Sequence, residues 1–335
     1  MTAEPLLSVR NLRTCFKTGR DTAWAVDGVS FDVYPDEILG IVGESGSGKS
    51  VTALSVLRLI ADPPGRITEG EVHFQGRNLL ELDYPEVREI RGRDIAMIFQ
   101  EPMTSLNPVF TIGKQVMEPL LVHGRVDRAT AADRAVEVLT QVGIPDARRR
   151  LGDYPHQFSG GMRQRVMIAM ALICEPTLLI ADEPTTALDV TIQAQILDLM
   201  KDLNDHRPGA SVILITHDLA VVAETCDRVI VLYGGKVQEV APVEEIFANA
   251  LHPYTQGLLE SIPHARNRGQ RLRTIPGHVP SLLEFPKGCK FSNRCPAVVD
   301  RCHAEEPELR EIRPGHWVRC HVVDPVLSAE SGGER

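Results

Sequence analysis

The eight residues from Gly43 to Ser50 constrain this chain more than any other stretch. They read Gly-Glu-Ser-Gly-Ser-Gly-Lys-Ser and match G-x-x-x-x-G-K-[ST], a pattern typical of loops that bind nucleotide phosphates. The apolar, β-branched run at 38–42 predicts a buried parallel strand before the loop, and the unbroken run at 51–60 predicts a helix after it. Strand, loop and helix in this order predict backbone N–H groups that surround phosphate oxygens at a helix N-terminus.

Each part of this loop has an expected contact with a nucleotide. Lys49 is expected to reach the β- and γ-phosphates, and the Ser50 hydroxyl is expected to bind Mg²⁺. An aromatic residue upstream, Phe16, either stacks on an adenine ring or belongs to the core, and Trp24 is a second candidate. The predicted contacts within the loop and at its end are Gly43, Ser45, Gly46, Ser47, Gly48, Lys49, Ser50 and Val51.

Composition limits the class of protein. The 335 residues, 43% of them hydrophobic, predict one large or two modest domains with a substantial core. The net charge of −9 argues against a nucleic-acid-binding surface. No apolar run approaches the length of a membrane span, and residues 1–10 lack a signal-peptide core, so a cytosolic chain is expected. A single phosphate loop and the absence of internal repeats predict one nucleotide-binding unit.

Polar residues follow three more predicted core strands, at 95–99, 178–181 and 212–216. Ligand sites of parallel sheets lie at the carboxyl ends of their strands. Asp182, after the second of these strands, is expected to hold Mg²⁺, and Glu183 is expected to take a proton from water. Gln100, after the first, either reaches Mg²⁺ or the attacking water or caps its strand. His217 ends the third.

The remaining pattern divides the chain. Short apolar runs over 6–40 predict a β layer beside the core, and the proline-broken stretch at about 101–160 predicts a helical insert. Ser159, Gly160 and Gly161 open a helix that runs to about residue 174, which predicts a second anion-binding helix N-terminus. We therefore expect a nucleotide-binding domain at 1–250 and a C-terminal extension at 251–335.

Four of the seven cysteines fall in that extension and could hold a metal: Cys289, Cys295, Cys302 and Cys320. We expect a structural [4Fe–4S] cluster, because the wide spacing and Cys295-Pro296 suit one, whereas the C-x₂-C pairs usual for zinc are missing. Zinc, with His303 and His321 as substitute ligands, and unmetallated thiols are the alternatives. The substitution Cys295→Ser is expected to disorder residues beyond about 285 and to leave a distant phosphate loop able to bind ATP.

The order of these motifs resembles the ATP-binding subunits of ABC transporters over residues 6–250. The resemblance covers the phosphate loop, Gln100, Ser159–Gly161, Asp182–Glu183, Ala187–Asp189 and His217. It implies an α/β fold: a P-loop NTPase core with an antiparallel β subdomain and a helical subdomain, to which the small cysteine-rich C-terminal extension is added. It also implies ATP hydrolysis, with two ATP molecules sandwiched head to tail between two such subunits.

The same resemblance assigns roles to individual residues. It implies that Phe16 stacks on adenine, that Glu183 is the general base and that His217 contacts the γ-phosphate. Gln100 would sense Mg²⁺ and touch the membrane subunits, and Mg²⁺ would be held by Ser50, Gln100 and Asp182. Ser159, Gly160 and Gly161 would contact ATP bound by the opposite subunit. Met162 departs from the family, which commonly has Gln there, so only that polar contact is in question.

Finer motifs look like the ATP-binding subunits of dipeptide and oligopeptide importers. They are residues 158–165, His252–Thr255, Ile275–Gly277 and the cysteine-rich tail, which in that family looks like a cluster-binding extension. This implies peptide import powered from the cytoplasmic face of the inner membrane by a peripheral subunit. The implied partners are a second ATP-binding subunit, expected to be a different chain, two membrane permease subunits and, indirectly, an extracytoplasmic binding protein, with no nucleic acid.

Other functions remain open or are disfavoured. Nickel importers and some glutathione importers share these motifs, so the motifs do not decide the cargo. ABC ATPases that organise DNA carry a very long coiled coil between loop and signature, where this chain has about 110 residues, and ribosome-acting relatives carry two nucleotide units. Because Lys49, Asp182, Glu183 and His217 are all present, a module with a dead site is also disfavoured.

Overall fold

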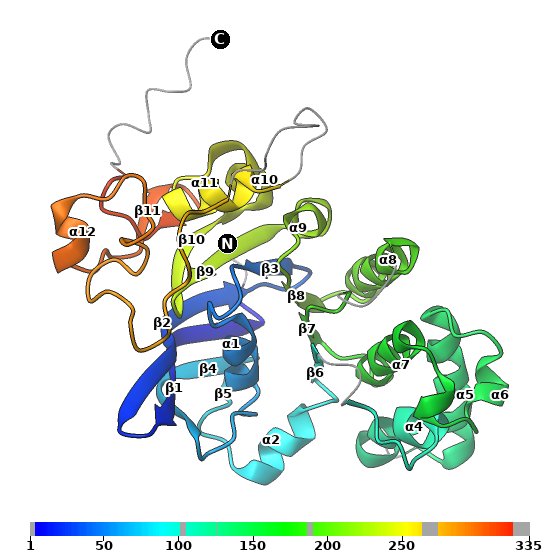
Figure 1. Ribbon diagram of the computed structural model, residues 1–335. Helices are drawn as coiled ribbons and strands as arrows, with labels where there is room; N and C mark the ends of the chain where they lie inside the picture. The colour runs from blue at the N-terminus through cyan, green and yellow to red at the C-terminus, as the bar shows by residue number, and fades with distance from the viewer. Residues whose placement is uncertain (1–3, 101–104, 125, 186–189, 263–273, 324–335) are drawn as a thin grey trace. The chain divides into compact units, whose positions relative to one another are not determined.

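The computed structural model describes residues 4–100, 105–124, 126–185, 190–262 and 274–323 (Figure 1). The chain divides into two compact units. The first unit comprises Met1–Leu6, Val33–Ile38 and Glu81–Ile215. The second unit comprises Leu7–Asp32, Leu39–Leu80 and Thr216–Arg335.

The first unit contains three neighbouring parallel strands: β6 (Ile95–Ile98), β7 (Leu178–Asp182) and β8 (Ser211–Ile215). Every residue of β7 and β8 is buried. Strands covered on both faces are apolar along their whole length, which explains why these runs do not alternate with polar residues. The strands end at the same edge, so the residues that follow them are placed there together.

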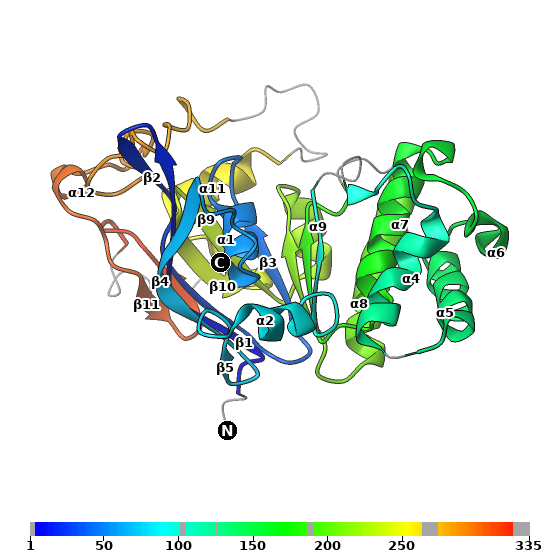
Figure 2. The same ribbon diagram turned by 90° about the horizontal axis from the view of Figure 1, so that it is seen from below.

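The described part of the first unit also contains helices. Within the stretch expected to hold a helical insert, the structure has α4 (Ile112–His123), α5 (Arg128–Gln141), α6 (Ala147–Arg150) and the 3-10 turn Pro155–Gln157. Helix α4 packs against α5 and α7, as Figure 2 shows. Side chains cap the first two helices: Thr111 accepts from the N–H of Lys114, and Asp127 from that of Thr130. The other helices of this unit are α2 (Tyr84–Ile90), α7 (Gly160–Leu172) and α8 (Val190–His206).

The second unit contains an antiparallel sheet with the strand order β2-β1-β4-β5. The expected β layer is therefore present, and helix α1 (Lys49–Val56) packs against β1. The paired strands β1 and β4 bring Phe16 opposite Gly65. The strands of this sheet are β1 (Leu7–Thr18), β2 (Asp21–Val33), β4 (Gly65–Phe74) and β5 (Arg77–Asn78).

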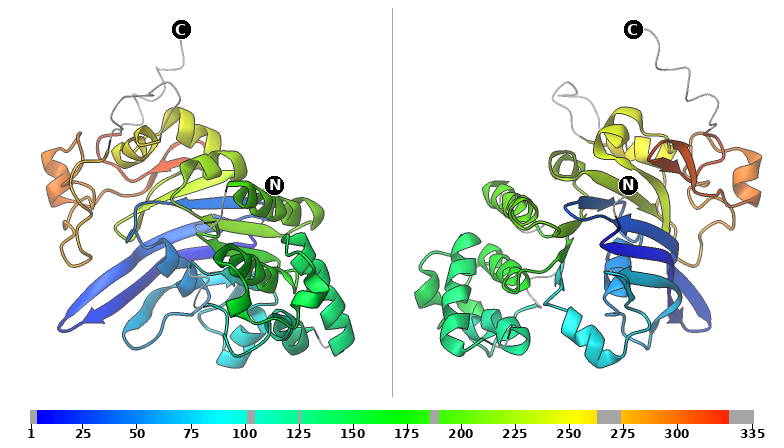
Figure 3. Two further views of the ribbon diagram at one scale, coloured as in Figure 1. Left: turned by 45° about the vertical axis from the view of Figure 1, so that its right-hand side comes forward. Right: turned by 180° about the vertical axis from the view of Figure 1, so that it is seen from behind.

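A second group of strands joins the C-terminal extension to the core of this unit. In it, β3 (Ile38–Val42) pairs in parallel with β9 (Arg228–Tyr233), which pairs antiparallel with β10 (Lys236–Pro242). β12 (His316–Val318) then pairs with β10, and β11 (Arg310–Arg313) pairs with β12 (Figure 3). The extension therefore adds strands to the sheet that carries the phosphate loop. The helices of this part are α9 (Leu219–Thr225), α10 (Val243–Asn249), α11 (Pro253–Glu260) and α12 (Asp300–Ala304).

A buried contact between two side chains fixes this junction. His316 in β12 and Glu239 in β10 lie 2.7 Å apart (Nε2 to Oε1), and both side chains are almost fully buried. Burial alone would raise the pKa of Glu239, but hydrogen bonds from His316 and from the N–H groups of Leu251 and His252 lower it below its ordinary value. A buried carboxylate with this many donors stays ionised and ties three segments together.

Within the described ranges, none of the helices combines the length and the hydropathy that a bilayer crossing requires.

Candidate active site

The phosphate loop joins β3 to α1, as its sequence predicts. Its backbone has positive φ at Gly43 (150°), Gly46 (79°) and Gly48 (101°). A Cβ at Gly43 would lie 2.2 Å from the carbonyl oxygen of Leu232, and one at Gly48 would lie 2.3 Å from that of Ala25. Neighbouring strands therefore approach the loop so closely that only glycine fits at these two positions.

Two side chains in the loop are arranged to meet an anion. Lys49 is buried (6% exposed), and its Nζ donates to the carbonyl oxygens of Gly43 (2.7 Å) and Glu44 (3.1 Å). Ser47 is 1% exposed, and its Oγ has no hydrogen-bond partner among the residues described. Buried polar atoms are normally paired, so an ammonium resting on carbonyls and an unsatisfied hydroxyl fit a phosphate group that would engage both.

His217 lies beside this loop although it is far away in the sequence. The N–H of Thr216 donates to the carbonyl oxygen of Ile41 in β3 at 3.3 Å, which holds the chain next to the end of that strand. Gly43, Glu44 and His217 then line one cavity of about 340 Å³. The structure thus brings the predicted histidine and the phosphate loop to the same space.

The structure shows how the two candidate adenine-stacking residues are packed. Phe16 is half-buried, and a Cβ on Gly65 would lie 2.7 Å from its Cε1, so the ring covers that glycine. Arg13 lies over the ring of Trp24, with its guanidinium carbon 5.7 Å from the ring centroid. Phe16 therefore packs against the sheet, and its stacking on adenine stays a prediction.

The first unit holds the predicted carboxylates. Asp182 is the last residue of β7 and is 3% exposed, and Glu183 follows with φ of 48°, which is uncommon for a residue other than glycine. The N–H of Glu183 donates to the carbonyl oxygen of Ile215 (2.9 Å), and its Oε2 accepts from Nε2 of Gln100 (3.1 Å). Such uncommon backbone conformations cluster at functional sites. Gln100 and Glu183, 83 residues apart, are neighbours.

The glycine pair after Ser159 begins helix α7. Ser159 is the N-cap residue, and its Oγ accepts from the N–H of Met162 at 3.3 Å. Ser159 and Gly160 are exposed, and open space surrounds the position of a Cβ at Gly160. The start of this 13-residue helix is therefore accessible, as a contact with a ligand outside this unit requires.

The four cysteines of the extension lie near one another without forming a recognisable metal site. The N–H of Cys289 donates to the carbonyl oxygen of Cys302 at 2.8 Å. Burial raises the pKa of Cys289 to about 11, a hydrogen bond from the N–H of Phe291 opposes this shift, and negative charge on the other three cysteines would add to it. In the part of the chain that the structure describes, no group of three or more His, Cys, Asp or Glu side chains is arranged to hold a metal ion. The side chains as placed do not fit the expected [4Fe–4S] cluster or zinc.

Sequence reasoning missed a contact between the extension and the phosphate loop. Arg294 donates through both terminal nitrogens to the carboxylate of Glu44, at 2.6 and 2.9 Å, and the N–H of Glu44 donates to the hydroxyl of Tyr254 at 2.7 Å. The expectation that the loop is distant from the cysteine segment is therefore wrong, because Arg294 directly precedes Cys295. The sequence offered one weak signal, a charged residue among cysteines in a loop-rich segment.

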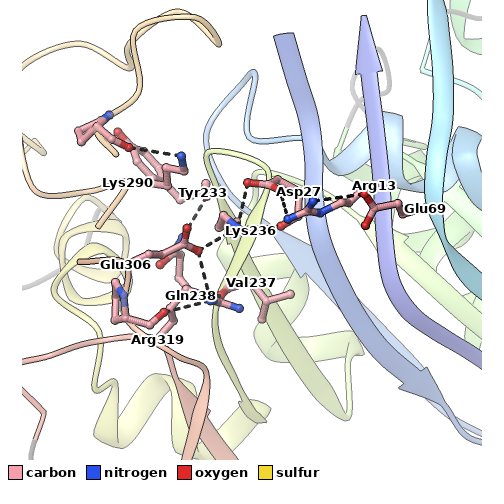
Figure 4. A network of polar contacts seen from close by, with 12 residues as sticks. Arg13, Asp27, Glu69, Tyr233, Lys236, Val237, Gln238, Lys290, Glu306 and Arg319 are labelled. Atoms are coloured by element: carbon pink, nitrogen blue, oxygen red, sulfur yellow. Dashed lines mark hydrogen bonds and ion pairs between the residues drawn. The ribbon is translucent and has the colours of Figure 1, made fainter. Parts of the chain in front are cut away.

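A second network fastens the extension to the β layer (Figure 4). Lys236 in β10 lies 2.9 Å from Asp27 of β2 and 2.8 Å from Glu306 of the extension. Arg319, also in the extension, donates from Nε to the carbonyl oxygen of Val237 at 2.8 Å. Among the residues described, this network does not include the phosphate loop, so it attaches the extension separately from the contact between Arg294 and Glu44.

Comparison with known proteins agrees with this architecture. A family model described as ABC transporter matches residues 26–186, and one described as oligopeptide/dipeptide transporter, C-terminal region, matches 238–302. A dimeric ATP-binding cassette solved in a post-hydrolysis state with ADP and phosphate has a TM-score of 0.65 and 32% identity, covering 71% of this chain and 98% of its own. The fold and the phosphate loop thus define an ABC-type ATPase, which confirms the predicted P-loop NTPase core. The small cysteine-rich extension to that core stays a prediction.

Full-length relatives narrow the class. A probable peptide ABC transporter ATP-binding protein of Sinorhizobium fredii is 57% identical over 97% of both chains. The dipeptide transport ATP-binding protein DppD of Escherichia coli is 49% identical over 94% of this chain and 96% of its own. The chain belongs to the oligopeptide and dipeptide branch of the ABC transporter ATP-binding proteins. It is an ATP-hydrolysing subunit, and ATP with Mg²⁺ is the expected ligand.

Proposed function

We propose that this chain hydrolyses ATP to power the import of peptides through an ABC transporter in the cytoplasmic membrane. The observation that carries the proposal is the union, in one unit, of a glycine-built phosphate loop with a C-terminal region like that of oligopeptide and dipeptide transporters. Import of nickel, glutathione or another small solute by the same machinery is the alternative.

The residues of the chain have distinct parts in the proposed reaction. Ser50, Gln100 and Asp182 would hold Mg²⁺, which would neutralise phosphate charge when bound with ATP. Lys49 exchanges its carbonyl partners for phosphate oxygens. Glu183 takes a proton from the attacking water, and Gln100, hydrogen-bonded to that carboxylate, orients it.

His217, which lies next to the phosphate loop, is the remaining residue with a proposed role at the nucleotide. Its place on the cavity shared with Gly43 and Glu44 supports a contact with the γ-phosphate. Phe16 stacks on adenine in the proposed complex. The nucleotide is thereby held at its base and along its phosphates by residues of one unit.

The assembly is part of the proposal. A second ATP-binding subunit, a different chain, would place its ATP against Ser159, Gly160 and Gly161, which the exposure of Ser159 and Gly160 supports. Two membrane permease subunits would contact the helical part of the first unit, where Val109, Leu121 and Val122 are exposed apolar side chains. A binding protein outside the membrane would deliver the peptide. The chain itself would lie at the cytoplasmic face of the inner membrane, without nucleic acid.

Reconstitution of the whole transporter in proteoliposomes tests this function. The proteoliposomes contain the permease pair, both ATP-binding subunits and the binding protein. Labelled dipeptides and oligopeptides are offered as cargo, and nickel or glutathione as competitors. Peptide uptake that needs ATP, and that Ser159→Arg in this chain abolishes, is the expected result. Uptake of nickel or glutathione with no peptide uptake would favour the alternative cargo, and loss of ATP binding by the isolated Ser159→Arg chain would contradict the two-subunit site.

The cysteine segment needs its own test. The proximity of four thiols supports a [4Fe–4S] cluster with a structural role, although the arrangement of the side chains does not. Anaerobic purification followed by iron, sulfide and zinc analysis distinguishes an iron–sulfur cluster, a zinc site and free thiols. Iron and sulfide with a visible absorption band support the cluster, stoichiometric zinc without iron supports the zinc alternative, and absence of both leaves free thiols.

A further inference from the structure

We propose that Arg294 of the C-terminal extension is a positioning residue for the bound nucleotide and acts through Glu44 of the phosphate loop. The guanidinium neutralises and fixes this carboxylate, so the affinity of the loop for polyphosphate depends on the extension. The inference rests on the ATP binding assigned above, and the experiment below separates the two.

Glu44 is held at each of its polar groups. Its carboxylate accepts one hydrogen bond from each terminal nitrogen of Arg294, and its N–H donates to Tyr254 of α11. Its carbonyl oxygen accepts from the N–H of Ser47 and from Nζ of Lys49, both at 3.1 Å. The same residue therefore contacts the extension through its side chain and the phosphate-binding lysine through its backbone. A shift of Glu44 would move the groups that meet the phosphates.

The charge of Glu44 makes this contact matter for a nucleotide. A carboxylate in a loop that binds several phosphate charges would repel them unless a cation compensates it. Arg294 is that cation, with a side chain only 4% exposed, whereas Glu44 is 27% exposed. The hydrogen bonds to Glu44 raise the pKa of Arg294 above its ordinary value, so the guanidinium stays charged.

The surroundings of Arg294 fix its orientation as well as its charge. Its Nε donates to the carbonyl oxygen of Pro276 at 3.0 Å, and its guanidinium carbon lies 5.8 and 5.9 Å from the ring centroids of Tyr233 and Phe291. A planar guanidinium held by a carbonyl and two rings presents its two terminal nitrogens to one carboxylate. Lysine cannot reproduce this bidentate geometry.

The competing explanation is that Arg294 only ties the extension to its unit. The network around Lys236 offers a matched control, because Arg319 also attaches the extension but bonds to Val237, Pro307 and Glu306 and not to the loop. Loss of either arginine should loosen the extension. Only loss of Arg294 should uncover a negative charge beside the phosphates.

The test measures dissociation constants of ATP, ADP and AMP for the full-length chain at two salt concentrations. Arg294→Ala should weaken ATP binding by roughly tenfold, as expected when a partly buried carboxylate loses its partner, with a smaller loss for ADP and little for AMP. The loss should shrink at high salt. Arg294→Lys should fall between wild type and Arg294→Ala, because it keeps the charge without the fork. The double variant Glu44→Gln/Arg294→Ala should bind ATP within about twofold of Glu44→Gln alone, since the uncompensated charge is gone.

Thermal unfolding of Arg319→Ala and Arg294→Ala shows whether the two variants lose a similar amount of stability. Arg319→Ala should bind ATP, ADP and AMP with the affinities of wild type. Equal losses for ATP, ADP and AMP, or the same loss in Arg319→Ala, would overturn the proposal in favour of a simple tie. Wild-type affinities in Arg294→Ala would also overturn it. If Arg294→Ala does not fold, Arg294→Lys and the double variant decide by the same criteria. Failure of the wild-type chain to bind ATP would overturn the nucleotide assignment together with this inference.

Discussion

The two units present different kinds of functional group. In the second unit, the phosphate loop offers backbone N–H groups and one lysine, and glycines at fixed positions let neighbouring strands approach. In the first unit, the groups are side chains at strand ends, Asp182, Glu183 and Gln100, on a sheet buried on both faces. Binding by a backbone loop depends on shape, whereas chemistry by a carboxylate depends on one atom. Substitutions should therefore act differently in the two units.

The largest effect is expected in the first unit, on the rate of hydrolysis. Glu183→Gln keeps the shape of the side chain and its contact with Gln100 but removes its basicity. ATP hydrolysis by the assembled transporter should fall by about 10²- to 10⁴-fold, the usual loss for a general base. ATP affinity should be unchanged. Turnover close to wild type in steady-state assays would remove Glu183 from the catalytic role.

The next effect is expected in the second unit, on shape. Gly43→Ala places a methyl group 2.2 Å from the carbonyl oxygen of Leu232 at a φ of 150°, and should cost about 3 to 4 kcal/mol of unfolding free energy. Gly46→Ala is the matched control, because its φ is 79° but nothing lies within 4 Å of a Cβ there. It should cost about 1 kcal/mol. If urea unfolding gives the same loss of unfolding free energy for Gly43→Ala and Gly46→Ala, the close approach of the strand is not the reason that position 43 requires glycine.

A smaller effect concerns the buried polar network of the second unit. Burial lowers the pKa of His252 from 6.5 to about 4. The charge of Glu239 opposes this shift, and the charge of Arg319 adds to it. Below pH 6.5 the unfolded chain binds a proton that the folded chain excludes until about pH 4, so stability falls across this window. The loss should reach at most about 3 kcal/mol at pH 4.

His252→Gln is the control for this prediction, because it cannot titrate and leaves the carboxylates in place. Its unfolding free energy should fall less between pH 6.5 and 4 than that of wild type. Parallel pH profiles for the two proteins would show that other groups cause the acid sensitivity.

The smallest effect returns to the first unit. Ser159→Ala removes the side-chain cap of α7 and should cost about 1 kcal/mol of stability, whereas Ser159→Asp keeps a cap. Neither substitution should change ATP binding by the isolated chain if Ser159 serves a nucleotide bound elsewhere. A loss of ATP affinity in isothermal titration calorimetry would place Ser159 in the chain's own nucleotide site. The proposed difference in role between the two units would then be wrong.

Local patterns predicted much of this molecule. The phosphate loop, the buried strands β7 and β8 and the start of α7 follow from glycine spacing, unbroken apolar runs and a capping serine, all within a few residues. The contact between Arg294 and Glu44 joins residues 250 positions apart and has no local pattern. The expectation that the phosphate loop is distant from the cysteine segment failed for this reason, because the spacing of the cysteines does not indicate which loop Arg294 contacts.

The pairing of β12 with β10 has a consequence for synthesis of the chain. Glu239 leaves the ribosome 77 residues before His316, its partner. At about 5–20 residues per second, β10 waits about 4 to 15 seconds with an unpaired edge. An open strand edge can recruit other chains. We therefore expect nascent chains stalled before residue 310 to be more prone to aggregate than completed ones.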